Sequence, residues 1–193
     1  MRSRPKRRGQ LKVRDIAARL ERLPACAGEK GYERGVLQLA EIDATNWRMA
    51  LAVEVRTDQV PFVADVQPVA LVILAKCYVR PDGQAWTPYL ALDGGEPVGV
   101  VAVASEDDHA HLRHFAIDHR RQDQGLGRVM LDAVIAAVSG SQPTCRYLQV
   151  TTHPENEIAL SLYQSAGFRQ TGAYSGIEPV LTLDLTDPRP KRA

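Results

Sequence analysis

The sequence predicts an α/β fold, with a mixed central sheet and helices packed on both of its faces. The chain has 193 residues, 45% of them hydrophobic, which is enough for one domain with a sizeable core. Stretches with alternating apolar residues, typical of strands, are interspersed with apolar residues at helical spacing. In the middle of the chain, a strand pattern runs into a glycine-containing loop and then into a helix.

The N-terminal half predicts an extension followed by the first sheet elements. Residues 1–34 are expected to form a basic arm and a short helical extension outside the main domain, which spans 35–186. Asp43 or Thr45 can cap the first helix of that domain, and the second helix is apolar almost all round and therefore buried. The expected elements are a strand over 35–42, helices over 43–54 and 68–78, and a hairpin of strands over 87–92 and 97–104.

The C-terminal half alternates strands and helices. Gly167 is suited to end a helix in the left-handed conformation. A basic tail over 187–193 follows the last strand. The expected elements are strands over 110–117, 146–152, 169–174 and 179–184, and helices over 125–138 and 156–166.

Charge and composition argue against a nucleic-acid-binding, membrane-spanning or metal-binding protein. The net charge of +1 combines basic ends with an acidic body, since residues 23–186 carry 12 basic and 20 acidic side chains, a net −8. The basic arm is interpreted as a solvated tail, so nucleic acid is not an expected partner. No apolar run suggests a membrane span, and three widely spaced cysteines favour a reducing, cytoplasmic setting. No pattern of metal ligands is present in the sequence.

The central loop has the pattern of a phosphate-binding device. Backbone N–H groups at the start of a helix point outward together, and the helix dipole adds positive potential there. Gly125 and Gly127 would let a pyrophosphate approach the backbone, with Arg120, Arg121 and Arg128 adding charge. A Rossmann site fits less well because the loop is central and has two glycines, and a Walker loop is excluded because no Gly-Lys-Ser/Thr follows.

Two sequence motifs follow one another in the second half of the chain. The first is Gln122-Asp-Gln-Gly-Leu-Gly127, which fits Arg/Gln-x-x-Gly-x-Gly/Ala. The second is Asn156-Glu-Ile-Ala-Leu-Ser-Leu-Tyr-Gln-Ser-Ala-Gly-Phe168, which fits Asn-x-x-Ala-x-x-Leu-Tyr-x-x-x-Gly-Phe. In this order the two motifs resemble those of the GNAT superfamily of N-acetyltransferases. The resemblance covers 35–185 and implies a GNAT fold, a mixed and mostly antiparallel sheet whose two middle strands splay apart.

The resemblance also implies a cofactor site for acetyl-CoA. The strand before the loop would pair with the pantetheine arm, and the loop would bind the pyrophosphate. The implied cofactor-binding residues are Phe115, Ala116, Ile117, Gln122, Asp123, Gln124, Gly125, Leu126, Gly127, Arg128 and Asn156.

Acyl transfer to an amine needs a base for the ammonium and a proton for the leaving thiolate. Tyr163 matches the family tyrosine that protonates the CoA sulfur, and His111 falls where the family places its general base. Each residue also has a purely structural alternative: Tyr163 as an aromatic side chain packed on its helix, and His111 as a histidine on the surface of a strand. Regular strand alternation puts His111, Phe115 and Ile117 on one face, with His114 on the opposite face in a structural role.

The acceptor is less clearly indicated. Residues 46–64 resemble the spermine/spermidine acetyltransferase-like branch, which implies a polyamine-like acceptor contacted by Trp47, Glu54 and Phe62. The acidic body agrees with a cationic acceptor. Three alternatives stay open: an aminoglycoside, a protein amine, and a CoA-binding regulatory module without catalysis. A homodimer is also consistent with the sequence.

Overall fold

The computed structural model describes residues 37–81 and 83–187. The expectations for the extension over 1–34, for Cys26 and for nearly all of the basic tail lie outside these residues. The strands are β1 (Gln38–Glu41), β2 (Ala85–Asp93), β3 (Glu96–Glu106), β4 (His109–Ile117), β5 (Tyr147–Thr151), β6 (Arg169–Ser175) and β7 (Glu178–Asp184). The helical segments are α2 (Trp47–Leu51), η1 (Thr57–Gln59), α3 (Val60–Val63), α4 (Val69–Val79), η2 (His119–Arg121), α5 (Leu126–Ser141) and α6 (Glu157–Ser165).

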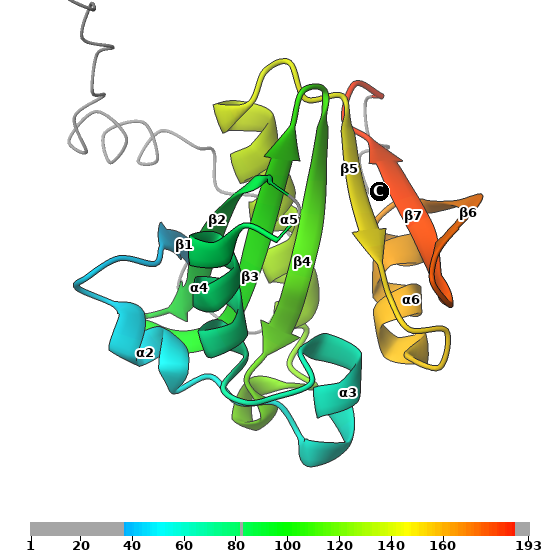
Figure 1. The fold of residues 1–193 in the computed structure, drawn as a ribbon. Helices are drawn as coiled ribbons and strands as arrows, with labels where there is room; N and C mark the ends of the chain where they lie inside the picture. Colours follow the sequence, from blue (N-terminus) through cyan, green and yellow to red (C-terminus); the bar gives the residue numbers. More distant parts are fainter. Residues whose placement is uncertain (1–36, 82, 188–193) are drawn as a thin grey trace, which may run out of the picture. The chain divides into compact units, whose positions relative to one another are not determined.

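The seven described strands form one sheet in the order β1-β2-β3-β4-β5-β7-β6. Every neighbouring pair is antiparallel except β4 and β5, which are parallel. Helices α2 and α4 cover one face of the sheet and α5 covers the other (Figure 1). The predicted mixed α/β fold is therefore confirmed. The short segments η1 and α3 were not predicted, and α2 is shorter than the expected helix over 43–54.

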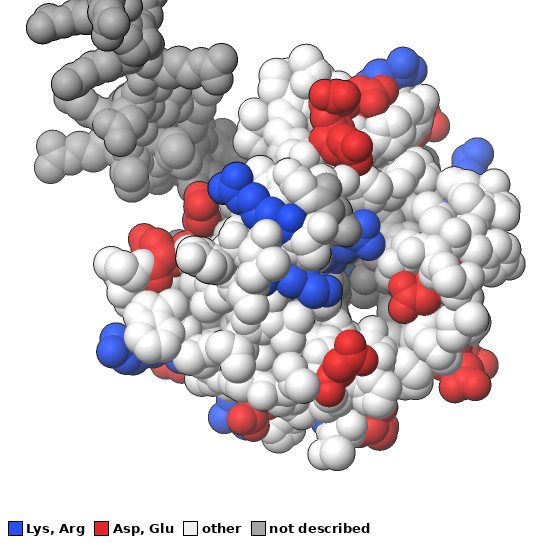
Figure 2. Space-filling model, viewed as in Figure 1, with Lys and Arg blue, Asp and Glu red and all other residues white. Residues whose placement is uncertain are grey.

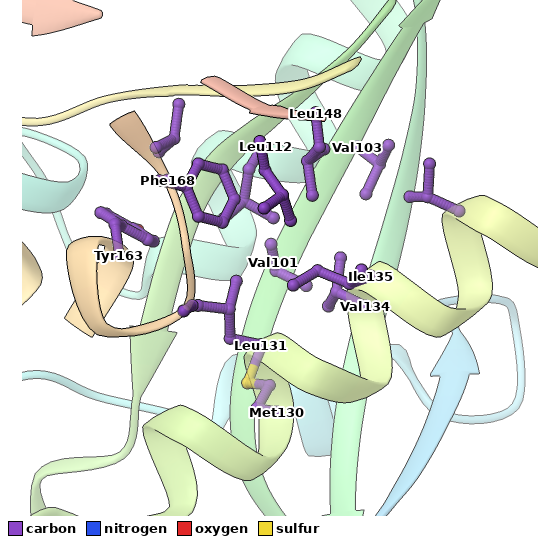
Figure 3. Packing of buried hydrophobic residues seen from close by; sticks show 14 of the residues in the cluster. Val101, Val103, Leu112, Met130, Leu131, Val134, Ile135, Leu148, Tyr163 and Phe168 are labelled. Atoms are coloured by element: carbon purple, nitrogen blue, oxygen red, sulfur yellow. The ribbon is translucent and has the colours of Figure 1, made fainter. Parts of the chain in front are cut away.

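The face of the sheet under α5, here called the α5 side, holds the larger core. Helix α5 buries one stripe of side chains at helical spacing, including Met130, Leu131, Val134 and Ile135. These face apolar residues from β3, β4 and β5, with Tyr163 and Phe168 alongside (Figure 3). Burial of this stripe, at about 1.5–3 kcal/mol for each fully buried large side chain, holds α5 and the loop before it against the sheet.

The opposite face, here called the α4 side, has a second core. Helix α4 is apolar almost all round, as the sequence suggested, but only Val69, Ala70 and Ile73 are buried. They pack over small residues of the central strand, including Ala102 and Ala104. The small side chains of β3 therefore allow α4 to pack close to the sheet on this side.

The sheet opens between β4 and β5. Their pairing begins at His109 with Tyr147 and ends at Leu112 with Val150. Beyond Leu112, β4 continues to Ile117 without a strand partner on that side. The splayed pair of middle strands expected from the resemblance is therefore present.

A β-bulge lies at the point where the two strands separate. Val100 pairs with Ala116 and Ala102 pairs with Arg113, so β4 has two residues where β3 has one. His114, one of the two, adopts the left-handed region with φ 52°. Bulges of this kind bend a strand and redirect its side chains.

The bulge reverses the sides of the residues that follow it. Phe115 and Ile117 pack against the α5-side core, whereas the register places His111 on the α4 side. His114 also lies on the α4 side, with its ring 5.7 Å from that of Trp86. The expectation that His111 shares a face with Phe115 and Ile117, opposite His114, is wrong because the extra residue shifts the period-two pattern.

Within the described ranges, no helix is long and apolar enough to cross a bilayer. Cys77 and Cys145 are free thiols. No group of three or more His, Cys, Asp or Glu side chains among the described residues is arranged to hold a metal ion.

Gly99 on β3 is expected to be essential for the packing of α5. A Cβ at this position would lie 2.7 Å from the Ala116 carbonyl oxygen and 2.7 Å from Met130 Sδ. Because backbone cannot yield as a flexible side chain can, Gly99→Ala should lower the free energy of unfolding by about 1–3 kcal/mol in urea denaturation. Gly140→Ala is the control, since it faces open space in α5 and should leave stability unchanged or raise it slightly. Equal stability of Gly99→Ala and the wild type would contradict this role.

Candidate active site

The candidate site lies at the opening between β4 and β5. The space-filling view shows a hollow in the surface over this gap (Figure 2). Helix α3 reaches across it, because the ring of Phe62 lies 5.2 Å from that of His153, which follows β5. The opening is thus bordered by β4, by α3 and by the segment between β5 and α6.

The loop after β4 presents unpaired backbone donors. Gly125 caps α5 in the left-handed conformation, with φ 74°, which explains the need for glycine there. The N–H groups of Leu126 and Gly127 begin the helix and have no acceptor among the described residues. Three consecutive features, a left-handed turn, a helix start and free N–H groups, make an anion-binding arrangement.

Gly127 lies where the start of α5 comes close to α6 and β4. A Cβ at this position would contact Leu162 Cδ2 at 3.7 Å and Ile117 Cγ1 at 3.9 Å. It therefore points toward neighbouring side chains at ordinary contact distance. The packing of α5 against α6 and β4 therefore does not itself require glycine at this position.

The three arginines around the loop are paired with carboxylates. Arg121 forms an ion pair with Asp93, and Arg128 forms one with Asp132 at 2.9 Å. Arg128 also donates to the Ser165 carbonyl oxygen. The guanidinium groups of Arg121 and Arg128 thus bind neighbouring segments of the chain.

Arg120 pairs with Asp118, whose carboxylate is buried. The Asp118 side chain is 1% exposed and accepts three hydrogen bonds from Arg120, at 2.8–2.9 Å, and one from the Glu54 N–H. Arg120 also donates to the Ala52 carbonyl oxygen. Burial alone would raise the pKa of Asp118, but these hydrogen bonds and the Arg120 charge outweigh it and lower the pKa to about 2.

Gln122 and Asp123 connect the loop to η1. The Gln122 and Gln59 side-chain amides donate to each other, at 2.9 and 3.1 Å. Gln122 also donates to the Ile117 carbonyl oxygen. Asp123, in the left-handed region with φ 62°, pairs with Arg56 at 2.9 Å. The sequence indicated neither Gln59 nor Arg56, because contacts 63–67 residues apart leave no local pattern.

Tyr163 on α6 lies beside the unpaired part of β4. It is 4% exposed, and its ring packs against Phe115, with centroids 6.3 Å apart, and Phe168, at 5.6 Å. Burial raises the pKa of the Tyr163 phenol, so it stays protonated at neutral pH. The packed aromatic and the proton donor are therefore compatible roles.

Asn156 forms the N-cap of α6. Its side-chain oxygen accepts a hydrogen bond from the Ala159 N–H at 3.2 Å. The cap fixes the start of the helix that carries Tyr163.

His111 lies on β4 before the opening. Its Nε2 is 3.6 Å from a Glu106 carboxylate oxygen. Burial lowers the pKa of His111, the nearby Arg113 charge lowers it further, and Glu106 opposes the shift in part. The imidazole is therefore neutral at pH 7, as a general base requires.

His114 and Lys76 form a pair that the sequence did not indicate. His114 Nδ1 lies 2.6 Å from the Val63 carbonyl oxygen, which can only accept, so Nδ1 carries the proton. Nε2 then accepts from Lys76 Nζ at 3.0 Å. Burial lowers the pKa of His114, and the Lys76 charge acts in the same direction. With both nitrogens engaged, His114 positions α3 and α4 against the bulge.

The three predicted acceptor residues lie on separate segments. Trp47 on α2 packs beside the α4-side core under the guanidinium of Arg48, 4.3 Å from its ring centroid. Glu54 is exposed and its charge acts on Arg120. Phe62 alone borders the opening, through its contact with His153.

Comparisons with known proteins agree with this geometry. Residues 43–168 match the sequence profile of the Acetyltransferase (GNAT) family. Among solved structures, the aminoglycoside acetyltransferase AAC(6')-Ib with paromomycin and acetyl-CoA has a TM-score of 0.63 at 18% identity, covering 77% of this chain and 93% of that one. An acetyltransferase from Thermus thermophilus has a TM-score of 0.60 at 19% identity, covering 77% and 97%. A GNAT family acetyltransferase from Elizabethkingia anophelis with acetyl-CoA bound has a TM-score of 0.54 at 18% identity, covering 77% and 98%.

Asp118 is expected to stabilise the loop in a pH-dependent way. Since its pKa is depressed in the folded protein, its contribution is present above about pH 4 and is lost as the pH falls toward 2. Asp118→Asn should lower the free energy of unfolding by about 2 kcal/mol at pH 7, and the difference from the wild type should shrink over that range. Asp123→Asn, which removes an 85% exposed carboxylate, should cost less than about 1 kcal/mol. A constant difference between pH 7 and pH 2 in urea titrations would contradict the assignment.

Proposed function

The chain belongs to the GNAT family of acetyltransferases, and from this premise we propose that it transfers an acetyl group from acetyl-CoA to a primary amine of a small molecule. The observation that carries the proposal is the opening between β4 and β5, flanked by Tyr163 and followed by a loop with free helix-start N–H groups. No other described feature combines an anion-binding loop with a proton donor.

The described residues fit acetyl-CoA. The segment from Phe115 to Ile117 has no β5 partner, so its backbone can pair with the amide groups of pantetheine. The Ile117 carbonyl oxygen accepts one hydrogen bond, from Gln122, and keeps a second lone pair for a ligand. The start of α5 is suited to the pyrophosphate. Acetyl-CoA supplies the acetyl group as a thioester when bound.

Two side chains divide the proton transfers. His111, neutral at pH 7, accepts the proton that the acceptor ammonium must lose, directly or through water. The amine nitrogen then bonds to the carbonyl carbon as the carbon–sulfur bond breaks. Tyr163 donates its phenolic proton to the departing sulfur, and its burial keeps that proton in place until then. The nitrogen of the new bond then carries one proton more than an amide, and transfer of this proton through water to the Tyr163 phenolate restores the phenol. The products are the N-acetylated amine, CoA and the proton held by His111.

Two classes of amine are candidates for the acceptor. The acidic body of the chain favours a cationic acceptor of the polyamine type. The similarity to AAC(6')-Ib favours an aminoglycoside as a second candidate. Of the residues expected to contact a polyamine, Phe62 borders the opening. The charge of Glu54 interacts with that of Arg120.

Release of free thiol from acetyl-CoA tests the proposal. A panel of polyamines, aminoglycosides, amino acids and peptides should contain at least one amine that raises the release of CoA well above hydrolysis. The acetylated product should be confirmed by mass spectrometry. Tight binding of CoA without turnover of any amine would instead favour a CoA-binding module without catalysis.

Tyr163→Phe tests the role of the phenol. The variant should lower kcat by about 100-fold or more while leaving the Kd for CoA nearly unchanged, because the ring packing is retained. Tyr174→Phe is the control, since Tyr174 is exposed on β6 and its loss should not affect kcat. An unchanged kcat in Tyr163→Phe would remove this residue as the acid.

A further inference from the structure

Arg113 stands at the point where β4 and β5 separate. It follows Leu112, the last β4 residue paired with β5, and lies on the α4 side opposite Ala102. Its Nε is buried and has no hydrogen-bond acceptor among the described residues. No carboxylate in the described part of the chain forms an ion pair with it. Burying a guanidinium without a hydrogen-bond partner costs free energy of folding, so a ligand that supplies the missing acceptor would stabilise this arrangement.

Two more donors lie on the same side. Lys76 Nζ is 3.0 Å from His114 Nε2 and 5.5 Å from the ring centroid of Trp86. Within residues 37–81 and 83–187 it forms no ion pair with a carboxylate, although it is half-buried. The Trp86 side chain is 8% exposed, and its Nε1 has no acceptor in the same part of the chain. Lysine, arginine and indole N–H groups can only donate.

The register of the sheet brings these groups together. Trp86, Ala104 and His111 form one row across β2, β3 and β4, and Arg113 lies in the next row opposite Ala102. Because the β3 residues between them are alanines, no large side chain of that strand separates the donors. The charges of Lys76 and Arg113 both act on His114, which lies among them.

The two carboxylates near Lys76, Arg113 and Trp86 are exposed, and neither forms an ion pair with Lys76 or Arg113. Glu106 is exposed and contacts His111 at 3.6 Å and Gln84 at 2.7 Å. Asp65 is exposed and acts on His114 only through its charge. In the space-filling view, Lys and Arg surface borders the hollow on the α4 and β4 side, and acidic surface lies on its other sides (Figure 2).

We propose that Lys76, Arg113 and Trp86 form a subsite for an anionic group of the acceptor, a carboxylate or a phosphate. The acceptor would then be a small zwitterion, with its anion on the α4 side and its amine toward the opening. This inference rests on the proposed function, since it describes the acceptor of the same transfer. It narrows the primary amines of the proposed function to those that also carry an anion, and so argues against the polyamine and aminoglycoside candidates named above, which lack one. Charge-assisted hydrogen bonds from arginine and lysine are the usual means of holding such a group.

Matched pairs of amines test the subsite directly. Lysine and cadaverine differ by one carboxylate, as do ornithine and putrescine, and phosphoethanolamine and ethanolamine differ by a phosphate. At least one anion-bearing member should have a kcat/KM about tenfold or more above that of its partner. The carboxylate and phosphate pairs distinguish the two sources of the anion. Equal or higher kcat/KM for every amine that lacks the anion would overturn the proposal.

Variants show whether these residues cause the preference. Arg113→Gln and Lys76→Met should each lower the ratio of kcat/KM within the preferred pair by about tenfold. A merely structural role, or a change in the pKa of His111, would lower both members alike and leave the ratio unchanged, which would overturn the assignment. Arg169→Gln, at an exposed position on β6, is the control and should leave the ratio as in the wild type.

A binding experiment separates this inference from the proposed function. Glutarate carries carboxylates and no amine, so its binding does not depend on acetyl transfer. Calorimetry in the presence of CoA should show saturable binding of glutarate, or of phosphoethanolamine where that pair is preferred, and Arg113→Gln should abolish it. Binding without turnover of any amine would refute the transferase and keep the anion subsite. Turnover of amines without binding of either probe would refute the subsite alone.

Discussion

The loss of pairing between β4 and β5 after Leu112 is the constraint on which the site depends. A parallel pair that stayed closed would use the backbone groups of Phe115 to Ile117 within the sheet and leave none for a ligand. The bulge at His114 occurs at the same place and turns two consecutive side chains toward the α4 side. One local irregularity therefore leaves backbone groups of β4 unpaired and places Arg113 and His114 on the same side of the sheet.

Buried polar groups connect this irregularity to the neighbouring segments. Asp118 ties the end of β4 to the segment after α2 through the Glu54 N–H and Arg120. His114 ties the bulge to α3 and α4 through the Val63 carbonyl oxygen and Lys76. The packing of α5 against Gly99 and its neighbours supports the same strand from the other side. The opening is thus held on both faces by contacts that a regular strand would not need.

Much of the fold could be predicted from the sequence because its signals are local. The glycine loop, the cap at Asn156 and the apolar stripe of α5 each occupy a short stretch with a definite periodicity or turn chemistry. The bulge could not be predicted, since it depends on pairing with β3, and so the faces of Phe115, Ile117 and His114 were assigned wrongly. For the same reason the pairing of the loop arginines and the grouping of Lys76 with Trp86 had no signal in the sequence.

The contacts between the loop and η1 differ in their response to ionic strength. The Arg56–Asp123 pair is exposed and would be screened by salt, since the Debye length falls from about 10 Å at 0.1 M to about 3 Å at 1 M. The reciprocal amide bonds of Gln59 and Gln122 involve no net charge and do not titrate. The amide pair is therefore expected to hold the loop after β4 to η1 at high ionic strength as well as at low ionic strength.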